Sequence, residues 1–171
     1  PAMTAFIALL RAVNVGGTGK LPMGELVAMC EALGHGQVKT WIASGNVVFT
    51  SDQDAAAVKA GLEAALLAWA GKPVAVMVRT ADEMRAVLAA NPFPDQPGNR
   101  TVAIFLDGAP GELDGLRHRA DEEIRPGVRE IYVHYPGGMG QSKLVIPAAK
   151  AGTARNMNTV AKLVEMAGAL A

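Results

Sequence analysis

Residues 38–50 read VKTWIASGNVVFT, two apolar stretches separated by the turn residues Ser44-Gly45-Asn46. Val38–Ala43 is interpreted as one strand, and Val47–Thr50 returns after the turn as a second. Gly-Asn is a pair favoured in tight hairpin turns, where the backbone takes positive φ angles. The stretch therefore predicts two neighbouring antiparallel strands, and the patterns on either side of it decide the fold.

The flanking segments alternate between strand-like and helix-like patterns. They are a buried strand at 6–10, a helix from Leu21-Pro22 to the glycines at 34 and 36, a helix from a cap at Ser51 or Asp52 to Trp69, and a strand at 74–78. Together with the hairpin they give the order β-α-β-β-α-β over residues 5–79. That order is typical of a ferredoxin-like unit, in which four antiparallel strands carry two helices on one face.

The second half of the chain shows a similar order. Its predicted elements are a helix at 80–88 with a capping box at Thr80 and Glu83, a linker at 91–98, a strand at 102–106, a charged helix at 113–123, a hairpin of 130–135 and 142–146, and a final helix from Asn158. From the linker onward the order β-α-β-β-α repeats the first half without its last strand. We therefore expect an α+β protein of two ferredoxin-like subdomains with antiparallel sheets, residues 1–80 and 81–171, packed as one compact unit with a hinge at 91–99.

Composition limits the class of protein. Half of the 171 residues are hydrophobic and 19% are charged, as in folded globular domains. Sixteen acidic residues balance sixteen basic ones, so no net field attracts nucleic acid or an anionic membrane. The single cysteine, Cys30, suits a reducing compartment and lies on the apolar stripe of a predicted helix. The first apolar run ends at Arg11, too short for a membrane span, and we expect a cytoplasmic protein.

No pattern for nucleotide hydrolysis, metal binding or acid–base catalysis accompanies these segments. The glycine-rich Gly16–Lys20 is similar to a phosphate-binding loop, but Leu21 follows it where a Ser or Thr would bind magnesium. The loop is then either a looser anion nest or a plain connector. The three histidines, at positions 35, 118 and 134, are isolated from one another, and Asp121-Glu122-Glu123 is interpreted as a solvated helix face. The sequence therefore predicts no metal and no cofactor, and it assigns no reaction.

Polar residues that the core does not need gather in predicted loops, and we interpret them as a candidate ligand site. They are Arg11, Asn14, Gly16, Gly17, Lys20, Ser44, Asn46, Ser142, Lys143, Arg155 and Asn156. Arg11 and Arg155 would hold an anion bidentately, while glycine amides and asparagines would orient it. A structural role competes at the C-terminal end, where Asn156, Asn158 or Thr159 can cap the final helix.

Several of these stretches resemble a bacterial domain-of-unknown-function family, number 1697. The matching pieces are Ala8–Gly17, Leu21-Pro22-Met23, Ser44–Phe49, Asn91-Pro92-Phe93, Gly140–Lys143 and Thr153–Val160. They follow one another in order over almost the whole chain. The resemblance implies two ferredoxin-like α+β subdomains, and it supplies no accepted activity, substrate or cofactor.

These observations favour the binding of a small anionic ligand, with phosphate as one candidate group, between the two halves. The alternative is a nucleic-acid or protein-interaction module that uses the face of a ferredoxin-like sheet. Modules that bind RNA stack bases on strand aromatics, and here the first and third strands offer only Phe6 and Phe49. Aromatic residues make up 5% of the chain and the net charge is zero, so anion binding is the leading hypothesis. The sequence does not indicate an oligomeric state.

Overall fold

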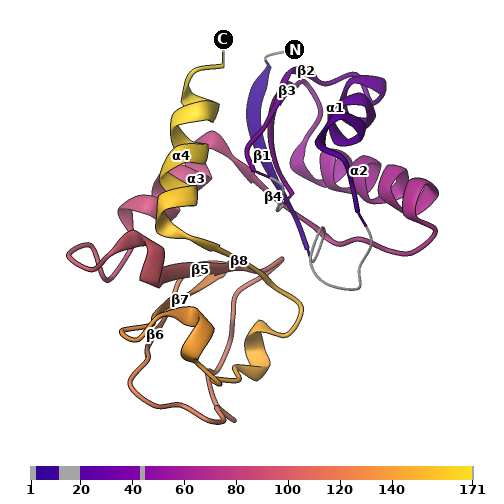
Figure 1. Cartoon of the computed structure of the whole chain (residues 1–171). Helices are drawn as coiled ribbons and strands as arrows, with labels where there is room; N and C mark the ends of the chain where they lie inside the picture. Colours follow the sequence, from indigo (N-terminus) through magenta and orange to yellow (C-terminus); the bar gives the residue numbers. More distant parts are fainter. Residues whose placement is uncertain (1–2, 12–19, 43–44, 171) are drawn as a thin grey trace. The chain divides into compact units, whose positions relative to one another are not determined.

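The computed structural model describes residues 3–11, 20–42 and 45–170, which form an α+β protein with two four-stranded antiparallel sheets (Figure 1). The chain divides into two compact units. Unit 1 comprises the chain up to Met84 together with the segment from Lys162 onward, and unit 2 comprises Arg85–Ala161. The predicted α+β class is confirmed, while the expected subdomain limits of 1–80 and 81–171 stay a prediction.

Unit 1 contains the β-α-β-β-α-β order that the first half of the sequence predicts. Its elements are β1 (Thr4–Leu10), α1 (Met23–Ala32), β2 (Gly36–Thr40), β3 (Asn46–Ser51), α2 (Ala55–Ala70) and β4 (Val76–Thr80). The sheet order is β2-β3-β1-β4, and β2 pairs antiparallel with β3 as the hairpin stretch predicts. β2 ends at Thr40, earlier than the predicted strand at 38–43. β1 is central: residues 6–10 are all buried, and it pairs antiparallel with both β3 and β4.

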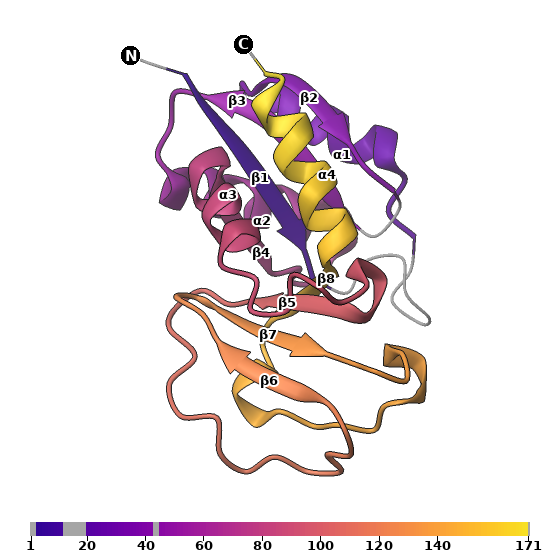
Figure 2. The ribbon, with the colours of Figure 1, turned by 90° about the vertical axis from the view of Figure 1, so that its left-hand side faces the viewer.

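One face of the first sheet packs on α1 and α2 (Figure 2). The buried cluster that they share includes Phe6, Ala8 and Phe49 from the strands, Leu26 from α1 and Leu62 from α2. The strand residues alternate along the chain because successive side chains of a strand point to opposite faces. Removing these apolar side chains from water is the main contribution that fixes both helices on the sheet.

Cys30 lies in α1 and is fully buried, as its place on the apolar stripe predicts. Burial, with a smaller contribution from Glu31, raises the pKa of its thiol to about 12. The thiolate is the reactive form of cysteine, and it is not populated near neutral pH at such a pKa. Cys30 is therefore a packing residue.

The starts of α2 and α3 (Ala81–Ala89) are set by side-chain caps. Asp54 caps α2 by accepting a hydrogen bond from a backbone N–H of its first turn. The predicted cap at Ser51 or Asp52 is wrong, because β3 continues through Ser51. The capping box is confirmed at α3: Thr80 N donates to Glu83 Oε1 at 2.8 Å, and Glu83 N donates to Thr80 Oγ1 at 3.1 Å.

Unit 2 is built on the second sheet, in which the strand order is β6-β7-β5-β8. After α3 the elements are the 3-10 turn η1 (Gly98–Arg100), β5 (Thr101–Phe105), β6 (Glu123–Pro126), β7 (Glu130–His134), the turns η2 (Met139–Gln141) and η3 (Pro147–Ala149), β8 (Thr153–Asn156) and α4 (Met157–Gly168). α3 begins in unit 1 and α4 ends there, so each of these helices belongs in part to both units. On one face of the sheet, Val102, Ile131 and Val133 pack against Leu113 and Leu144 from the loops after β5 and β7.

The predicted helix at 113–123 is wrong. The segment is irregular up to residue 122, and β6 begins at Glu123. Gly115 (φ +69°) and His118 (φ +58°) take left-handed backbone conformations, which interrupt a right-handed helix. β5 is therefore followed by β6 with no helix between them, and the repeated order β-α-β-β-α is absent from unit 2.

Two further segments of unit 2 differ from the sequence-based prediction. The predicted hairpin of 130–135 and 142–146 does not form: β7 pairs with β6 and β5, and within 142–146 only Val145 forms a bridge, to Arg117. The segment at 152–159, expected as a loop before the last helix, contains β8, in which Arg155 lies opposite Ala103 of β5. Pairing with β5 supplies partners for the backbone of this polar segment.

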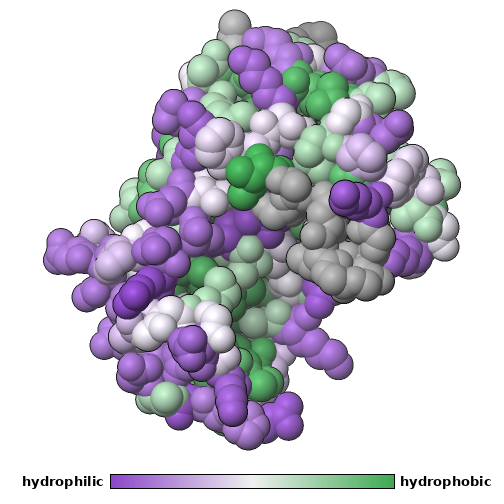
Figure 3. All heavy atoms as spheres, viewed as in Figure 1, coloured by the Kyte–Doolittle hydropathy of each residue, from purple (hydrophilic) through white to green (hydrophobic). Residues whose placement is uncertain are grey.

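Hydrophilic side chains cover much of the face shown in Figure 3. The large hydrophobic residues that remain exposed in the described part of the chain are Met3, Ile42, Leu67, Trp69, Val128 and Met139. Among the described residues, none of the helices combines the length and the apolar character that crossing a bilayer requires.

Candidate functional site

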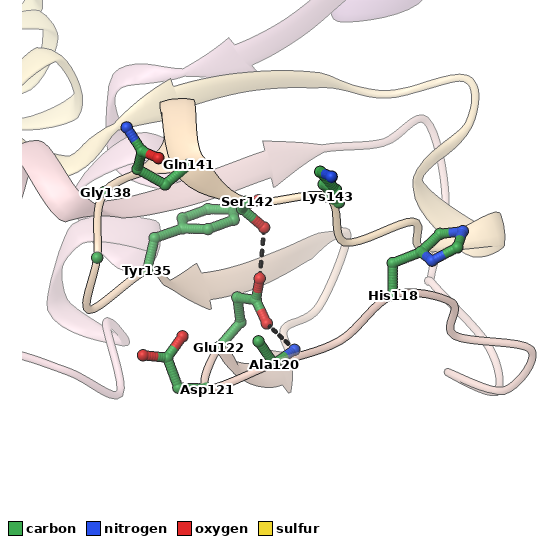
Figure 4. Close-up of a pocket in the computed structure, with 10 residues that line it drawn as sticks. His118, Ala120, Asp121, Glu122, Tyr135, Gly138, Gln141, Ser142 and Lys143 are labelled. Atoms are coloured by element: carbon green, nitrogen blue, oxygen red, sulfur yellow. Dashed lines mark hydrogen bonds between the residues drawn. The ribbon is translucent and has the colours of Figure 1, made fainter.

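A pocket lies between the loops that follow β5 and β7, and we call it the loop pocket (Figure 4). Its volume is about 210 Å³, and its lining residues are His118, Ala120, Asp121, Glu122, Tyr135, Gly137, Gly138, Gln141, Ser142 and Lys143. The two loops are joined by backbone hydrogen bonds in both directions between Arg117 and Val145, with N···O distances of 3.0 and 2.8 Å. All of these residues belong to unit 2.

Glu122 is the buried carboxylate of the loop pocket, with 3% of the residue exposed. Its Oε2 accepts a hydrogen bond from Ser142 Oγ, and its Oε1 accepts one from the backbone N–H of Ala120 at 2.6 Å (Figure 4). The bond from Ser142, followed by the bond from Ala120, lowers the pKa of Glu122 below its usual value. Glu122 is therefore an ionised carboxylate that clamps the two loops together. Its interpretation as part of a solvated helix face is wrong.

The hydroxyl of Ser142 is committed to this clamp. Its one proton is donated to Glu122, and its oxygen accepts a hydrogen bond from the backbone N–H of Leu144 at 3.1 Å. Ser142 has no second proton to donate to a ligand. A carboxylate of lowered pKa is also a weak base, so this pair does not resemble an activated serine nucleophile. Ser142 holds Glu122 and fixes the backbone beside Lys143.

Tyr135 and a glycine turn form another part of the wall. Burial, with a smaller contribution from Glu122, raises the pKa of Tyr135, so its phenol is neutral. The backbone N–H of Gly138 donates to the carbonyl of Tyr135 at 2.9 Å. Gly138 has φ +89° and ψ 149°, a conformation that essentially only glycine adopts. This turn leads directly into η2, which ends at Gln141 in the pocket wall.

Lys143 and Asp121 place opposite charges on the wall of the loop pocket. Both residues are exposed, and neither forms an ion pair with a residue that the structure describes. In the view of Figure 4 they lie on different sides of the Glu122 side chain. The pocket thus carries two separated charges of opposite sign in addition to the clamped carboxylate.

The predicted site residues in the first half of the chain belong to unit 1 and do not line the loop pocket where the structure describes them. Arg11 follows β1 and its backbone N–H donates to the carbonyl of Ala75 at 2.9 Å, and Lys20 is exposed before α1. Asn46 is fully buried at the start of β3, where its Nδ2 donates to the carbonyl of Trp41 at 3.0 Å. Asn46 therefore stabilises the connection between β2 and β3. Four more, Asn14, Gly16, Gly17 and Ser44, lie outside the described residues.

Arg155 and Asn156 lie in β8 and have structural partners. Arg155 is 8% exposed, and its Nη1 donates to Thr153 Oγ1 at 2.6 Å and to the carbonyl of Ala154 at 2.9 Å. Burial lowers the pKa of its guanidinium to about 10. Asn156 Oδ1 accepts a hydrogen bond from Thr159 N at 2.9 Å and caps α4, as one of the structural alternatives predicted. A ligand-binding role for these two residues stays a prediction.

Of the predicted site residues that the structure describes, Ser142 and Lys143 line the loop pocket. Gln141 was not predicted as a site residue. It belongs to the same polar run, Gly140–Lys143, and could have been predicted from that run. Glu122 and Tyr135 were missed because only the tertiary fold brings them there. Among the described residues, no three His, Cys, Asp or Glu side chains gather as metal ligands.

The fold and the pocket define a class: an α+β protein of two antiparallel sheets with a small, mixed-charge pocket between two loops. A family model described as "Protein of unknown function (DUF1697)" matches residues 3–132, and the chain belongs to this family. The predicted resemblance is thereby confirmed.

A solved structure shares this fold. The conserved bacterial protein SP0830 from Streptococcus pneumoniae is similar with a TM-score of 0.77 and 24% sequence identity, over 97% of this chain and 99% of that chain. At this identity the likeness establishes the fold alone. No curated protein matches the chain.

Proposed function

We propose that this protein binds a small anionic ligand in the loop pocket, with Lys143 as its cationic anchor. The observation that carries the proposal is that Lys143 lines a defined cavity and has no ion-pair partner among the described residues. An ammonium group is a strong donor to phosphate or carboxylate oxygens. A pocket with few well-placed polar groups is the usual form of a small-molecule site.

The remaining polar groups of the wall supply orientation. Lys143 has three N–H donors, Gln141 has an amide with two donors and one acceptor, and His118 can donate through its ring. Ser142 contributes indirectly, because its hydroxyl proton is engaged by Glu122. Anchoring of the anion is therefore assigned to Lys143, and the clamp between Ser142 and Glu122 positions the backbone that carries it.

The volume of the loop pocket favours a small ligand. At about 210 Å³ it is below the roughly 300–1,000 Å³ of pockets that bury drug-sized molecules. A single phosphate or carboxylate group on a short carbon chain fits this size better than a nucleotide does.

The alternative, a nucleic-acid module using a sheet face, receives no support from the aromatic residues expected to carry it. Phe6 is 2% exposed and Phe49 is 0% exposed, and both belong to the core under α1 and α2. Base stacking requires exposed aromatic faces. Small-ligand binding is therefore the function that we propose.

Glycerol phosphate and inorganic phosphate are suitable probes for this proposal. We expect glycerol phosphate in excess to raise the midpoint of thermal unfolding, since a ligand that binds only the folded state stabilises it. In amide NMR spectra, the shift changes should be confined to residues 118–122 and 137–143. Lys143→Gln should abolish both effects, because it removes the anchoring charge.

Lys39→Gln is the matched control. Lys39 is an exposed lysine of β2 in unit 1 and is not one of the residues that line the loop pocket. The control variant should respond to glycerol phosphate as the parent protein does. Absence of any shift with both probes, or an undiminished shift in Lys143→Gln, would contradict the proposal.

A further inference from the structure

We infer that the ligand of the loop pocket is a zwitterion, whose anionic group contacts Lys143 and whose ammonium group contacts Asp121. This inference rests on the proposed function and specifies the class of ligand. It follows from the separation of two opposite charges on one cavity wall, each without an ion-pair partner among the described residues.

The charge balance of the pocket favours a ligand with a positive group. Two carboxylates, Asp121 and Glu122, line the cavity against one lysine, Lys143, which leaves an excess of one negative charge when His118 is counted as uncharged. This excess weakens the binding of a ligand that carries only negative charge, although Lys143 still attracts its anionic group. An ammonium group on the same ligand is attracted by this excess.

Asp121 is the carboxylate that can accept this ammonium group. Both oxygens of Glu122 are engaged, one by Ser142 and the other by the backbone N–H of Ala120. Asp121 is exposed and none of the hydrogen bonds or ion pairs of the described residues engages its carboxylate. To bind the ammonium group, Glu122 would have to give up hydrogen bonds that it already accepts. The carboxylate of Asp121 accepts no such bond among the described residues, so it loses nothing by binding the ligand.

Asp121 and Lys143 do not form an ion pair with each other in the structure. Figure 4 shows them projecting from the two different loops, with the clamped Glu122 between them in that view. A short molecule with a charge at each end can contact both residues from within the cavity. The cavity of about 210 Å³ limits such a molecule to a few carbon atoms between its charged groups.

Two matched pairs of probes separate the contribution of the amine from that of the anion. Phosphoethanolamine is compared with ethyl phosphate, and γ-aminobutyrate with butyrate, so that each pair differs by one ammonium group. Isothermal titration calorimetry gives the dissociation constant of each probe. We expect the zwitterion of a pair to bind about two- to fivefold more tightly, the gain typical of one solvent-accessible ion pair. The two pairs also distinguish a phosphate from a carboxylate as the anionic group.

Variants assign the two ends of the ligand. Asp121→Asn should reduce the affinity for phosphoethanolamine to that for ethyl phosphate, without weakening ethyl phosphate. Lys143→Gln should weaken both probes. Glu123→Gln is the matched control: Glu123 is an exposed carboxylate near Asp121 in sequence but outside the pocket wall, and its replacement should preserve the preference.

The outcomes separate this inference from the proposed function. Equal affinities within both probe pairs, or a preference that survives Asp121→Asn, would overturn the zwitterion and leave anion binding intact. No binding of any of the four probes would overturn both. A preference that Asp121→Asn removes and Glu123→Gln retains supports the inference.

Discussion

His35 is a buried imidazole whose two ring nitrogens both lack a hydrogen-bond partner in the described structure. The residue is 5% exposed, and its ring stacks on Phe49 with centroids 4.4 Å apart. Burial lowers the pKa of His35, and Asp52 opposes that shift to a smaller extent. Protonation would place a charge beside the aromatic core of unit 1, so the neutral ring is the form that the fold accepts.

The pH dependence of stability follows from this shift. The folded state binds the proton of His35 more weakly than the unfolded state does, so stability is complete above the unfolded pKa of about 6.5 and declines as the pH falls below it. We predict that the urea midpoint decreases between about pH 7.5 and pH 5.5, and that His35→Phe, which can keep the ring stacked on Phe49, reduces this decrease.

His118→Gln provides the comparison for this prediction, since His118 is exposed and its imidazole is not packed in a core. Its replacement should leave the acid dependence as in the parent protein. If His35→Phe retained the full decrease, titration of other groups would be responsible and the prediction for His35 would fail.

At the scale of elements, β4 is an edge strand, and side chains of α2 bind the backbone groups of its first residue, Val76. The N–H of Val76 donates to Glu63 Oε2 at 2.9 Å, and the carbonyl of Val76 accepts a hydrogen bond from Lys59 Nζ at 2.6 Å. Lys59 and Glu63 also form an ion pair at 2.8 Å. Uncovered edge strands pair readily with strands of other molecules, and these contacts occupy the groups that such pairing would use.

We predict that the double variant Lys59→Ala/Glu63→Ala self-associates more strongly than the parent protein. The backbone groups of Val76 would be exposed for pairing between molecules. Sedimentation velocity over a range of protein concentrations measures the effect. Glu165→Ala breaks a different ion pair, on α4, and should leave the sedimentation unchanged. Identical sedimentation of the double variant and the parent would show that this cover is dispensable.

Most of the elements of unit 1 were predictable because their signals are local. β1 carries a continuous apolar run, and the Gly-Asn turn marks the hairpin of β2 and β3. The helix wrongly predicted at 113–123 has a composition that suits a solvated helix. Its left-handed residues Gly115 and His118 could not be recognised from that composition.

β8 and the loop pocket were less predictable because they depend on tertiary partners. β8 buries Arg155 and Thr153 in a strand, which its polar sequence does not favour, and it is stabilised by pairing with β5. Ser142 and Lys143 were predicted from a polar run. Glu122 was not, since a run of acidic residues gives no sign that one of them is buried against a serine from another loop.

At the scale of the molecule, unit 1 is assembled from two distant parts of the sequence. The segment from Lys162 onward belongs to the same compact unit as β1 to β4. Leu163 is 0% exposed and Ala167 is 2% exposed, and Lys162 Nζ lies 4.9 Å from the centre of the Trp41 ring. The last turns of α4 therefore contribute buried surface and a cation–π contact to unit 1.

We predict that a chain ending at Ala161 has a less stable unit 1. Loss of a fully buried leucine alone lowers the free energy of unfolding by about 2 kcal/mol. Hydrogen exchange followed by mass spectrometry should show faster exchange in β1 to β4, with a smaller change in β5 to β8. A chain ending at Ala167 retains Leu163 and should exchange like the full chain. Equal protection of both truncated chains would mean that these turns add little to unit 1.

The two-part composition of unit 1 has a consequence for biosynthesis. Domains usually fold as they leave the ribosome, the N-terminal one first. Here β1 to β4 are translated early, but the last turns of α4 are translated after every strand of both units. Unit 2, which is encoded in one continuous stretch, can be completed before unit 1 is. The sheet of β1 to β4 therefore lacks part of its final packing during synthesis. That packing is completed only when the last turns of α4 have left the ribosome.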